Sequence, residues 1–356
     1  MVSRLKSSAA GLILLCLAAC AGIDHNIPKH APISGAAPPG TITLFADANG
    51  YLYPDDWRAR FDARDIERSH SLLASKNFDR QVRDELVAER DRQLDEAARS
   101  LATRSRVFVL VHGFNNTQDQ ARRAFNRLRQ LLPLRPDDGV VEFHWDGLTS
   151  PGLIGRGVMW FKAVGYSQLA GTQALRELIR RLPDKEIVIV AHSRGASVTL
   201  SALSDPAYDP DFVRETASLS GVSLYSDPLP PDGAPIRAVF LAPAIGYPDF
   251  WRRDGGNGRD CEPFRSFPNR LRRIDYTVNP QDPVLDKPLV RPSTFNATDL
   301  GFDPVVGQLL RRCYAGRVEI VAHDLNMPAH PFLEYLREEN EELVGRMLAG
   351  TDPPRR

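Results

Sequence analysis

Two hydrophobic patterns alternate along this chain, and together they predict a sheet with helices between its strands. Helical spacing of apolar residues, typical of amphipathic helices, covers 62–101, 118–132, 166–182 and 332–348. Short apolar runs of the kind found in strands buried on both faces cover 41–46, 106–111, 140–145, 187–190, 236–242, 271–278 and 317–322. This order favours an α/β fold with a mostly parallel, doubly wound sheet and flanking helices.

Two stretches lack either pattern. Residues 150–165 are rich in glycine and contain Met159, Trp160 and Phe161. They could line a pocket or form a lid, or they could be an irregular loop that packs its aromatic rings into the core. Residues 246–268 form a long irregular connection, and connections of this length in a compact domain are often lid-like.

The first forty residues are typical of export rather than of a folded domain. A basic start with Arg4 and Lys6 precedes an apolar stretch that is too short to span a bilayer stably. Leu17-Ala18-Ala19-Cys20 resembles the bacterial lipoprotein signal, which implies cleavage after residue 19 and a lipid on Cys20; the alternative is a plain secretory signal. Because Ala21 replaces the Asp associated with retention, the resemblance implies a lipid-anchored protein on the outer membrane, facing the periplasm. The Pro-, Ala- and Gly-rich residues 20–40 indicate a flexible tether to a folded domain at 41–350.

Charge and cysteine content narrow the partners. The chain has 45 basic and 45 acidic residues, which gives no electrostatic case for nucleic-acid binding. Of the four cysteines, Cys16 leaves with the signal and Cys20 is lipidated, so Cys261 and Cys313 remain in an oxidising compartment. We predict a disulfide between them; the alternative is two separate buried thiols.

The residues from Ala191 to Gly195 carry the first chemical signal. They read Ala-His-Ser-Arg-Gly, between the apolar run 187–190 and a stretch of helical spacing. A serine at a sharp strand-to-helix turn needs small residues two positions away on either side, because those positions crowd each other. This pattern makes Ser193 a candidate nucleophile beside a helix N-terminus, whose dipole favours a negative charge. The alternative is an ordinary junction with an incidental serine.

A second signal follows the strand at 106–111. His112-Gly113-Phe114 lies at the strand exit, where a loop can donate a backbone N–H to a reacting oxygen, and glycine allows a close approach. We expect the N–H groups of Phe114 and Arg194 to form an oxyanion hole.

The two motifs together resemble the α/β-hydrolase superfamily, and more narrowly a poorly characterised bacterial hydrolase family with the motif Val-His-Gly-Phe-Asn-Asn, here residues 111–116. The resemblance covers roughly residues 41–348. Two departures affect the expected pocket: the family often has Trp-Pro-Ser where this chain has Trp145-Asp146-Gly147, and Ala-Pro-Asp where this chain has Ala242-Pro243-Ala244.

In this fold the catalytic acid and base follow the serine in the order acid, then histidine. Only His323 and His330 follow Ser193, and both are expected on the loop after the last strand. The resemblance favours His330, at the entrance of the last helix, over His323. It also favours Asp282, in the exit loop of the strand at 271–278, as the acid; the alternatives are Asp249, Asp275 and Asp286.

The sequence has no phosphate-binding glycine loop, and His25, His30, His70 and His144 show no metal-ligand spacing, so we expect neither cofactor nor metal. We therefore predict an envelope serine hydrolase that cleaves an acyl ester or thioester of a small-molecule or lipid substrate. The alternative is a non-catalytic envelope lipoprotein that uses a hydrolase scaffold for binding or assembly.

Overall fold

The computed structural model describes residue 28 and residues 40–149, 153–220, 224–251, 261–262, 264–286 and 298–351. The predicted signal peptide, the lipidation site Cys20 and most of the tether lie outside the described residues. Among those residues, no helix combines the length and the apolar character that crossing a lipid bilayer requires.

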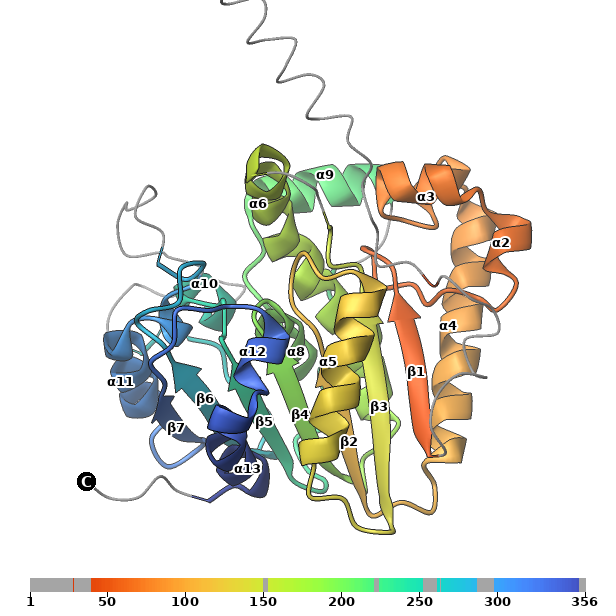
Figure 1. Ribbon diagram of the computed structural model, residues 1–356. Helices are drawn as coiled ribbons and strands as arrows, with labels where there is room; N and C mark the ends of the chain where they lie inside the picture. Colours follow the sequence, from red (N-terminus) through yellow and green to blue (C-terminus); the bar gives the residue numbers. More distant parts are fainter. Residues whose placement is uncertain are drawn as a thin grey trace, which may run out of the picture.

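Seven parallel strands form one sheet in the order β1-β3-β2-β4-β5-β6-β7 (Figure 1). Every neighbouring pair of strands is parallel, so all seven carboxyl ends lie along one edge of the sheet. The prediction of seven strands in a doubly wound sheet is confirmed, with β1 at the sheet edge. The strands are β1 (Thr41–Ala46), β2 (Arg106–Val111), β3 (Asp138–Trp145), β4 (Glu186–His192), β5 (Ile236–Leu241), β6 (Leu271–Val278) and β7 (Glu319–Asp324).

Helices cover both faces of the sheet, and each face has its own apolar core (Figure 1). On one face the core packs against α5 (Gln118–Leu131), α12 (Phe332–Tyr335) and α13 (Glu341–Ala349). On the other it packs against α4 (Arg80–Ser100), α7 (Arg176–Arg180), α8 (Gly195–Leu203) and α11 (Pro304–Cys313). The remaining α-helices are α2 (Trp57–Arg60), α3 (Ala63–Ser69), α6 (Leu153–Ala170), α9 (Pro210–Ser220) and α10 (Tyr247–Phe250).

The glycine-rich stretch at 150–165 is mostly helical, so its interpretation as an irregular loop is wrong. Helix α6 spans Leu153–Ala170 and continues through a π-helical turn, Gly171–Leu175, into α7. One of its glycines serves packing: a Cβ on Gly165 would lie 2.4 Å from Cδ2 of Phe212. A side chain at that position would separate α6 from α9, which carries Phe212.

The single helix predicted over 332–348 is also wrong, because the segment breaks into α12, a 3₁₀ turn at Glu338–Asn340, and α13. Side chains satisfy the backbone carbonyls at the break. Arg127 of α5 donates from Nε to the carbonyl of Leu336 at 3.0 Å, and Asn340 donates from Nδ2 to the carbonyl of Glu334 at 3.1 Å. These carbonyls therefore need no helical N–H partner.

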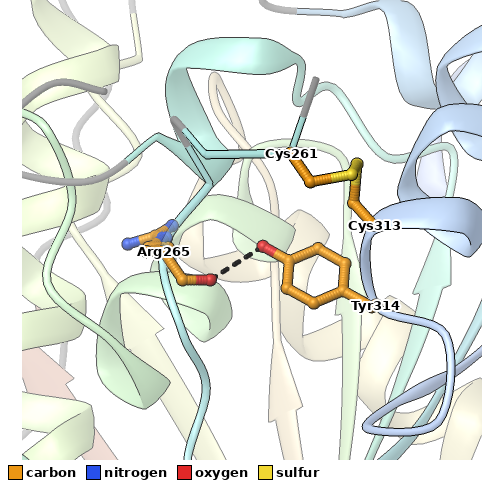
Figure 2. Close-up of a disulfide and its surroundings, with 4 residues drawn as sticks. All are labelled: Cys261, Arg265, Cys313 and Tyr314. Carbon is orange, nitrogen blue, oxygen red and sulfur yellow. Dashed lines mark hydrogen bonds between the residues drawn. A yellow bond between two sulfur atoms is a disulfide. The ribbon is translucent and has the colours of Figure 1, made fainter. Parts of the chain in front are cut away.

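The disulfide predicted between Cys261 and Cys313 is confirmed (Figure 2). It joins the long connection at 246–268 to the last residue of α11. The described part of that connection begins with α10 and an antiparallel bridge between Trp251 and Phe264. Next to the disulfide, the hydroxyl of Tyr314 donates a 2.9 Å hydrogen bond to the carbonyl of Arg265.

Candidate active site

Ser193 lies in the turn between β4 and α8, at the carboxyl edge of the sheet. Its φ is +53°, a left-handed conformation that is strained for a residue with a side chain. The turn is tight because β2 passes close beneath it. A Cβ on Gly195 would lie 2.6 Å from the carbonyl oxygen of His112, which is why the second position after the serine must be small.

The structure brings Ser193, His330 and Asp282 together in one chain of hydrogen bonds. Nε2 of His330 lies 3.0 Å from Oγ of Ser193, and Nδ1 of the same ring lies 2.8 Å from Oδ2 of Asp282. A carboxylate only accepts hydrogen bonds, so Nδ1 carries the proton and Nε2 accepts from the serine hydroxyl. This is the arrangement in which a histidine can take a proton from a serine.

Further donors hold Asp282, which is fully buried. The hydroxyl of Tyr335 donates to Oδ2 at 2.9 Å, while the backbone N–H groups of Val284 and Leu285 donate to Oδ1 at 2.9 and 3.2 Å. Asn279 in turn donates to the Tyr335 hydroxyl at 3.1 Å. The carboxylate is therefore fixed in position by its own turn and by α12.

The weaker candidates for acid and base have other partners. His323 lies inside β7, rather than on the loop after the strand as expected, and its Nε2 is 2.8 Å from Oδ1 of Asp275. Asp249 forms an ion pair with Arg194. The backbone N–H of Asp286 donates to the carbonyl of Asp282 at 2.9 Å, which places Asp286 one turn beyond the acid.

The backbone N–H groups of Phe114 and Arg194 are available as oxyanion donors, because neither donates a hydrogen bond within the described part of the chain. Gly113 brings their two loops together: a Cβ there would lie 2.7 Å from Cβ of Ser193. The N–H of Asn115 donates to the carbonyl of Gly147 at 2.7 Å, which anchors the loop after β2 to the loop after β3. Arg194 also caps the N-terminus of α8, where the helix dipole favours an anion.

Asp146, one of the departures from the family pattern, shapes the loop after β3. It is fully buried, accepts the N–H of Leu148 at 3.0 Å, and pairs with Nδ1 of His70 at 3.1 Å. Leu148 has a φ of +51°, so the Asp146 carboxylate supports a strained backbone next to Gly147. The pairing ties the loop to the segment after α3.

Trp160, on α6, lies beside both expected oxyanion donors. Its ring meets that of Phe114 edge to face, with centroids 5.5 Å apart, and the guanidinium carbon of Arg194 lies 5.8 Å from its centroid. Met159 packs against Leu148 and its neighbours. Trp160 therefore belongs to the wall of the site on a helix rather than on a loop.

Sequence reasoning missed two residues that hold the acid and the base. Tyr335 contacts Asp282, and Nε2 of the buried His192 donates a 2.8 Å hydrogen bond to the carbonyl of His330. Burial lowers the pKa of His192 well below its ordinary value, and the charge of His330 adds to that effect. No local pattern in the sequence marks Tyr335. His192 directly precedes Ser193, and this position in the motif could have indicated its role.

Burial also lowers the pKa of His112, to about 4. Its neutral ring fits the surroundings: Nε2 accepts the N–H of Trp145 at 3.2 Å, and Nδ1 donates to the carbonyl of Gly113 at 2.9 Å. The pKa of an unfolded-state histidine is near 6.5, so between pH 6.5 and 4 only the unfolded chain binds this proton. His112 therefore makes the free energy of unfolding fall as the pH falls through that window.

We predict that His112→Gln removes this contribution, because a neutral amide can keep both hydrogen bonds. When the pH falls from 8 to 5, the free energy of unfolding of the variant should decrease by about 2 kcal/mol less than that of the native protein. Urea unfolding at both pH values measures the difference. If the difference in free energy of unfolding between the two proteins is the same at pH 8 and at pH 5, the prediction is wrong.

Residues 89–226 match the model of a family described as alpha/beta hydrolase of unknown function (DUF900). The match runs from α4 through the Ser193 turn to the region after α9, and it stops before Asp282 and His330. Together with the seven-stranded parallel sheet, this partial match supports the α/β-hydrolase fold predicted from the sequence.

More distant likenesses add nothing on activity. An acetyl xylan esterase is 13% identical, with a TM-score of 0.33, and the match covers 70% of this chain and 99% of that one. An extracellular alpha/beta-hydrolase from a Paenibacillus species is also 13% identical, with a TM-score of 0.33, covering 69% and 99%. Because the similarity is this low, neither structure supports a conclusion about the chemistry of this chain. No curated protein matches the chain.

Proposed function

We propose that this α/β hydrolase is a serine hydrolase that cleaves an acyl ester or thioester. The observation that carries the proposal is the hydrogen-bonded series Ser193, His330 and Asp282. It is supported by two backbone N–H groups, of Phe114 and Arg194, which have no acceptor among the described residues. A nucleophile, a base, an orienting acid and oxyanion donors are the parts that acyl transfer needs.

In the proposed reaction, Oγ of Ser193 attacks the acyl carbonyl carbon while its proton moves to Nε2 of His330. The carbonyl oxygen becomes an oxyanion and accepts hydrogen bonds from Phe114 and Arg194. Asp282 stabilises the imidazolium through Nδ1. As the acyl–oxygen or acyl–sulfur bond breaks, His330 gives the proton to the leaving alcohol or thiol. Water then gives a proton to Nε2 of His330 as it attacks the acyl-serine. The bond between the acyl carbon and Oγ breaks, the proton passes from His330 to Oγ of Ser193, and the carboxylic acid is released.

Labelling with a fluorescent fluorophosphonate tests the proposal, because such probes phosphonylate an activated serine. The native protein should be labelled, and both Ser193→Ala and heat-unfolded protein should not. Ser201→Ala is a matched control: Ser201 is also buried, in α8, and its hydroxyl has no hydrogen-bond partner among the described residues. Absence of label on the native protein would favour the alternative, a scaffold used for binding or assembly.

We also propose that the protein is held to the outer membrane, facing the periplasm, by a lipid on Cys20. The support is the Leu17-Ala18-Ala19-Cys20 signal, together with a disulfide between the two cysteines of the domain, which suits an oxidising compartment. Mass spectrometry of the N-terminal peptide of the membrane-associated protein should find a diacylglyceryl-modified Cys20. An unmodified mature N-terminus at another residue would refute the lipid anchor.

A further inference from the structure

The ion pair between Arg194 and Asp249 lies directly behind the Ser193 turn. Both oxygens of Asp249 contact the guanidinium: Oδ2 lies 3.1 Å from Nη1 and Oδ1 lies 2.9 Å from Nη2. Both side chains are 0% exposed. A buried guanidinium needs a compensating charge, and a two-point contact with a carboxylate fixes its orientation.

The two terminal nitrogens of the guanidinium also contact the elements around the site. Nη1 also donates to the carbonyl of Ala244 at 2.9 Å, and Nη2 donates to the hydroxyls of Ser167 and Ser197 at 3.0 and 2.7 Å. The Ser197 hydroxyl in turn donates to Oδ1 of Asp249 at 2.7 Å. The side chain of Arg194 thus joins α6, α8 and the segment after β5, while its backbone N–H faces the proposed oxyanion.

Asp249 is held just as firmly on its own side. The N–H of Gly246 donates to Oδ2 at 3.1 Å, and the guanidinium of Arg265 donates to the carbonyl of Asp249. The carbonyl of Arg265 accepts the hydroxyl of Tyr314, the residue next to the disulfide at Cys313 (Figure 2). Contacts therefore run from the cross-linked segment to the residue after the nucleophile.

We infer that Asp249 is a positioning residue for the hydrolysis proposed above: through Arg194 it fixes the backbone N–H that stabilises the oxyanion. The inference rests on the proposed function. Oxyanion donors are effective when their direction is set before the reaction begins, and Arg194 follows a residue in strained left-handed geometry. Without its counter-ion, the buried guanidinium would have to move, and the peptide unit between Ser193 and Arg194 would move with it.

The test is the kinetics of Asp249→Asn, with Asp275→Asn as a matched control. Asp275 is equally buried and also contacts an arginine at two points, Nε and Nη2 of Arg273 at 2.8 and 2.9 Å, but it lies within β6. With p-nitrophenyl butyrate, Asp249→Asn should lower kcat about 100-fold and change KM less than about twofold, because the donor acts on the transition state. Asp275→Asn should keep kcat within about twofold, whatever its Tm.

The kinetics of two variants test the inference. If Asp249→Asn does not fold, Ser197→Ala removes one hydroxyl from the same network and should lower kcat about fivefold at constant KM. A kcat for Ser197→Ala equal to that of the native protein would then overturn the inference. A folded Asp249→Asn variant whose kcat equals that of Asp275→Asn would also overturn the inference. The same holds if the KM of Asp249→Asn rises in proportion to its loss of kcat. Failure of the proposed function is distinct, because the native protein would then be neither labelled nor active.

Discussion

Ser193→Ala is expected to lower kcat/KM for p-nitrophenyl butyrate by about 10⁴- to 10⁶-fold, the range found when a nucleophilic serine is removed from a triad. The change removes only the hydroxyl that lies 3.0 Å from Nε2 of His330. Residual turnover would come from the oxyanion donors and from substrate binding, which alanine leaves intact.

The fold should tolerate this change. Alanine keeps the Cβ that packs against Gly113, and within the described part of the chain the serine hydroxyl has one hydrogen-bond partner, His330. The Tm of Ser193→Ala should therefore stay within about 2 °C of the native value. Circular dichroism melting beside the kinetic assay separates loss of chemistry from loss of structure. Activity within tenfold of the native protein would rule out Ser193 as the nucleophile.

Removal of the disulfide is expected to have the largest effect on stability. Cys261 and Cys313 are 52 residues apart, and closing a loop of that size restricts the unfolded chain by roughly 4 kcal/mol. The stability of a whole domain is only about 5–15 kcal/mol, so this is a large share of it. The double variant Cys261→Ala/Cys313→Ala should lose about that amount in urea unfolding at 25 °C.

A reductant provides the control. Native protein treated with tris(2-carboxyethyl)phosphine should unfold at nearly the same urea concentration as the double variant, whose own curve should not respond to the reductant. Two free thiols in a titration of unfolded, unreduced protein would show that the bond does not form. When the disulfide is removed, the region around Asp249 should lose its structure first, because Tyr314 and Arg265 connect it to the cross-link.

The sheet and the Ser193 turn could be predicted because their signals are local. A strand buried on both faces is an unbroken apolar run, and the turn needs small residues at Ala191 and Gly195. Helix α6 was missed because glycine normally marks a loop, whereas Gly165 makes room for the ring of Phe212. The break after α12 depends on Arg127, more than 200 residues earlier, and no local pattern carries it.

In the candidate site, too, some residues could be predicted from the sequence and others could not. The order of acid and base left only His323 and His330 as candidate bases, and the resemblance to the family favoured His330 and Asp282. Asp249 was weighed only as a catalytic acid, because its partner Arg194 is 55 residues away and a buried ion pair has no pattern in the sequence. Tyr335 is similar, because its hydroxyl contacts Asp282 from α12, 53 residues further along the chain.

The close approach of Gly113 to Ser193 restricts how the proposed hydrolase site could be redesigned. A Cβ at position 113 would lie 2.7 Å from Cβ of Ser193 and 3.0 Å from the carbonyl oxygen of His192, so a substitution there would displace the proposed nucleophile. Attempts to admit bulkier or differently shaped acyl groups should start instead with Phe114 and Trp160, whose rings meet edge to face beside the expected oxyanion donors.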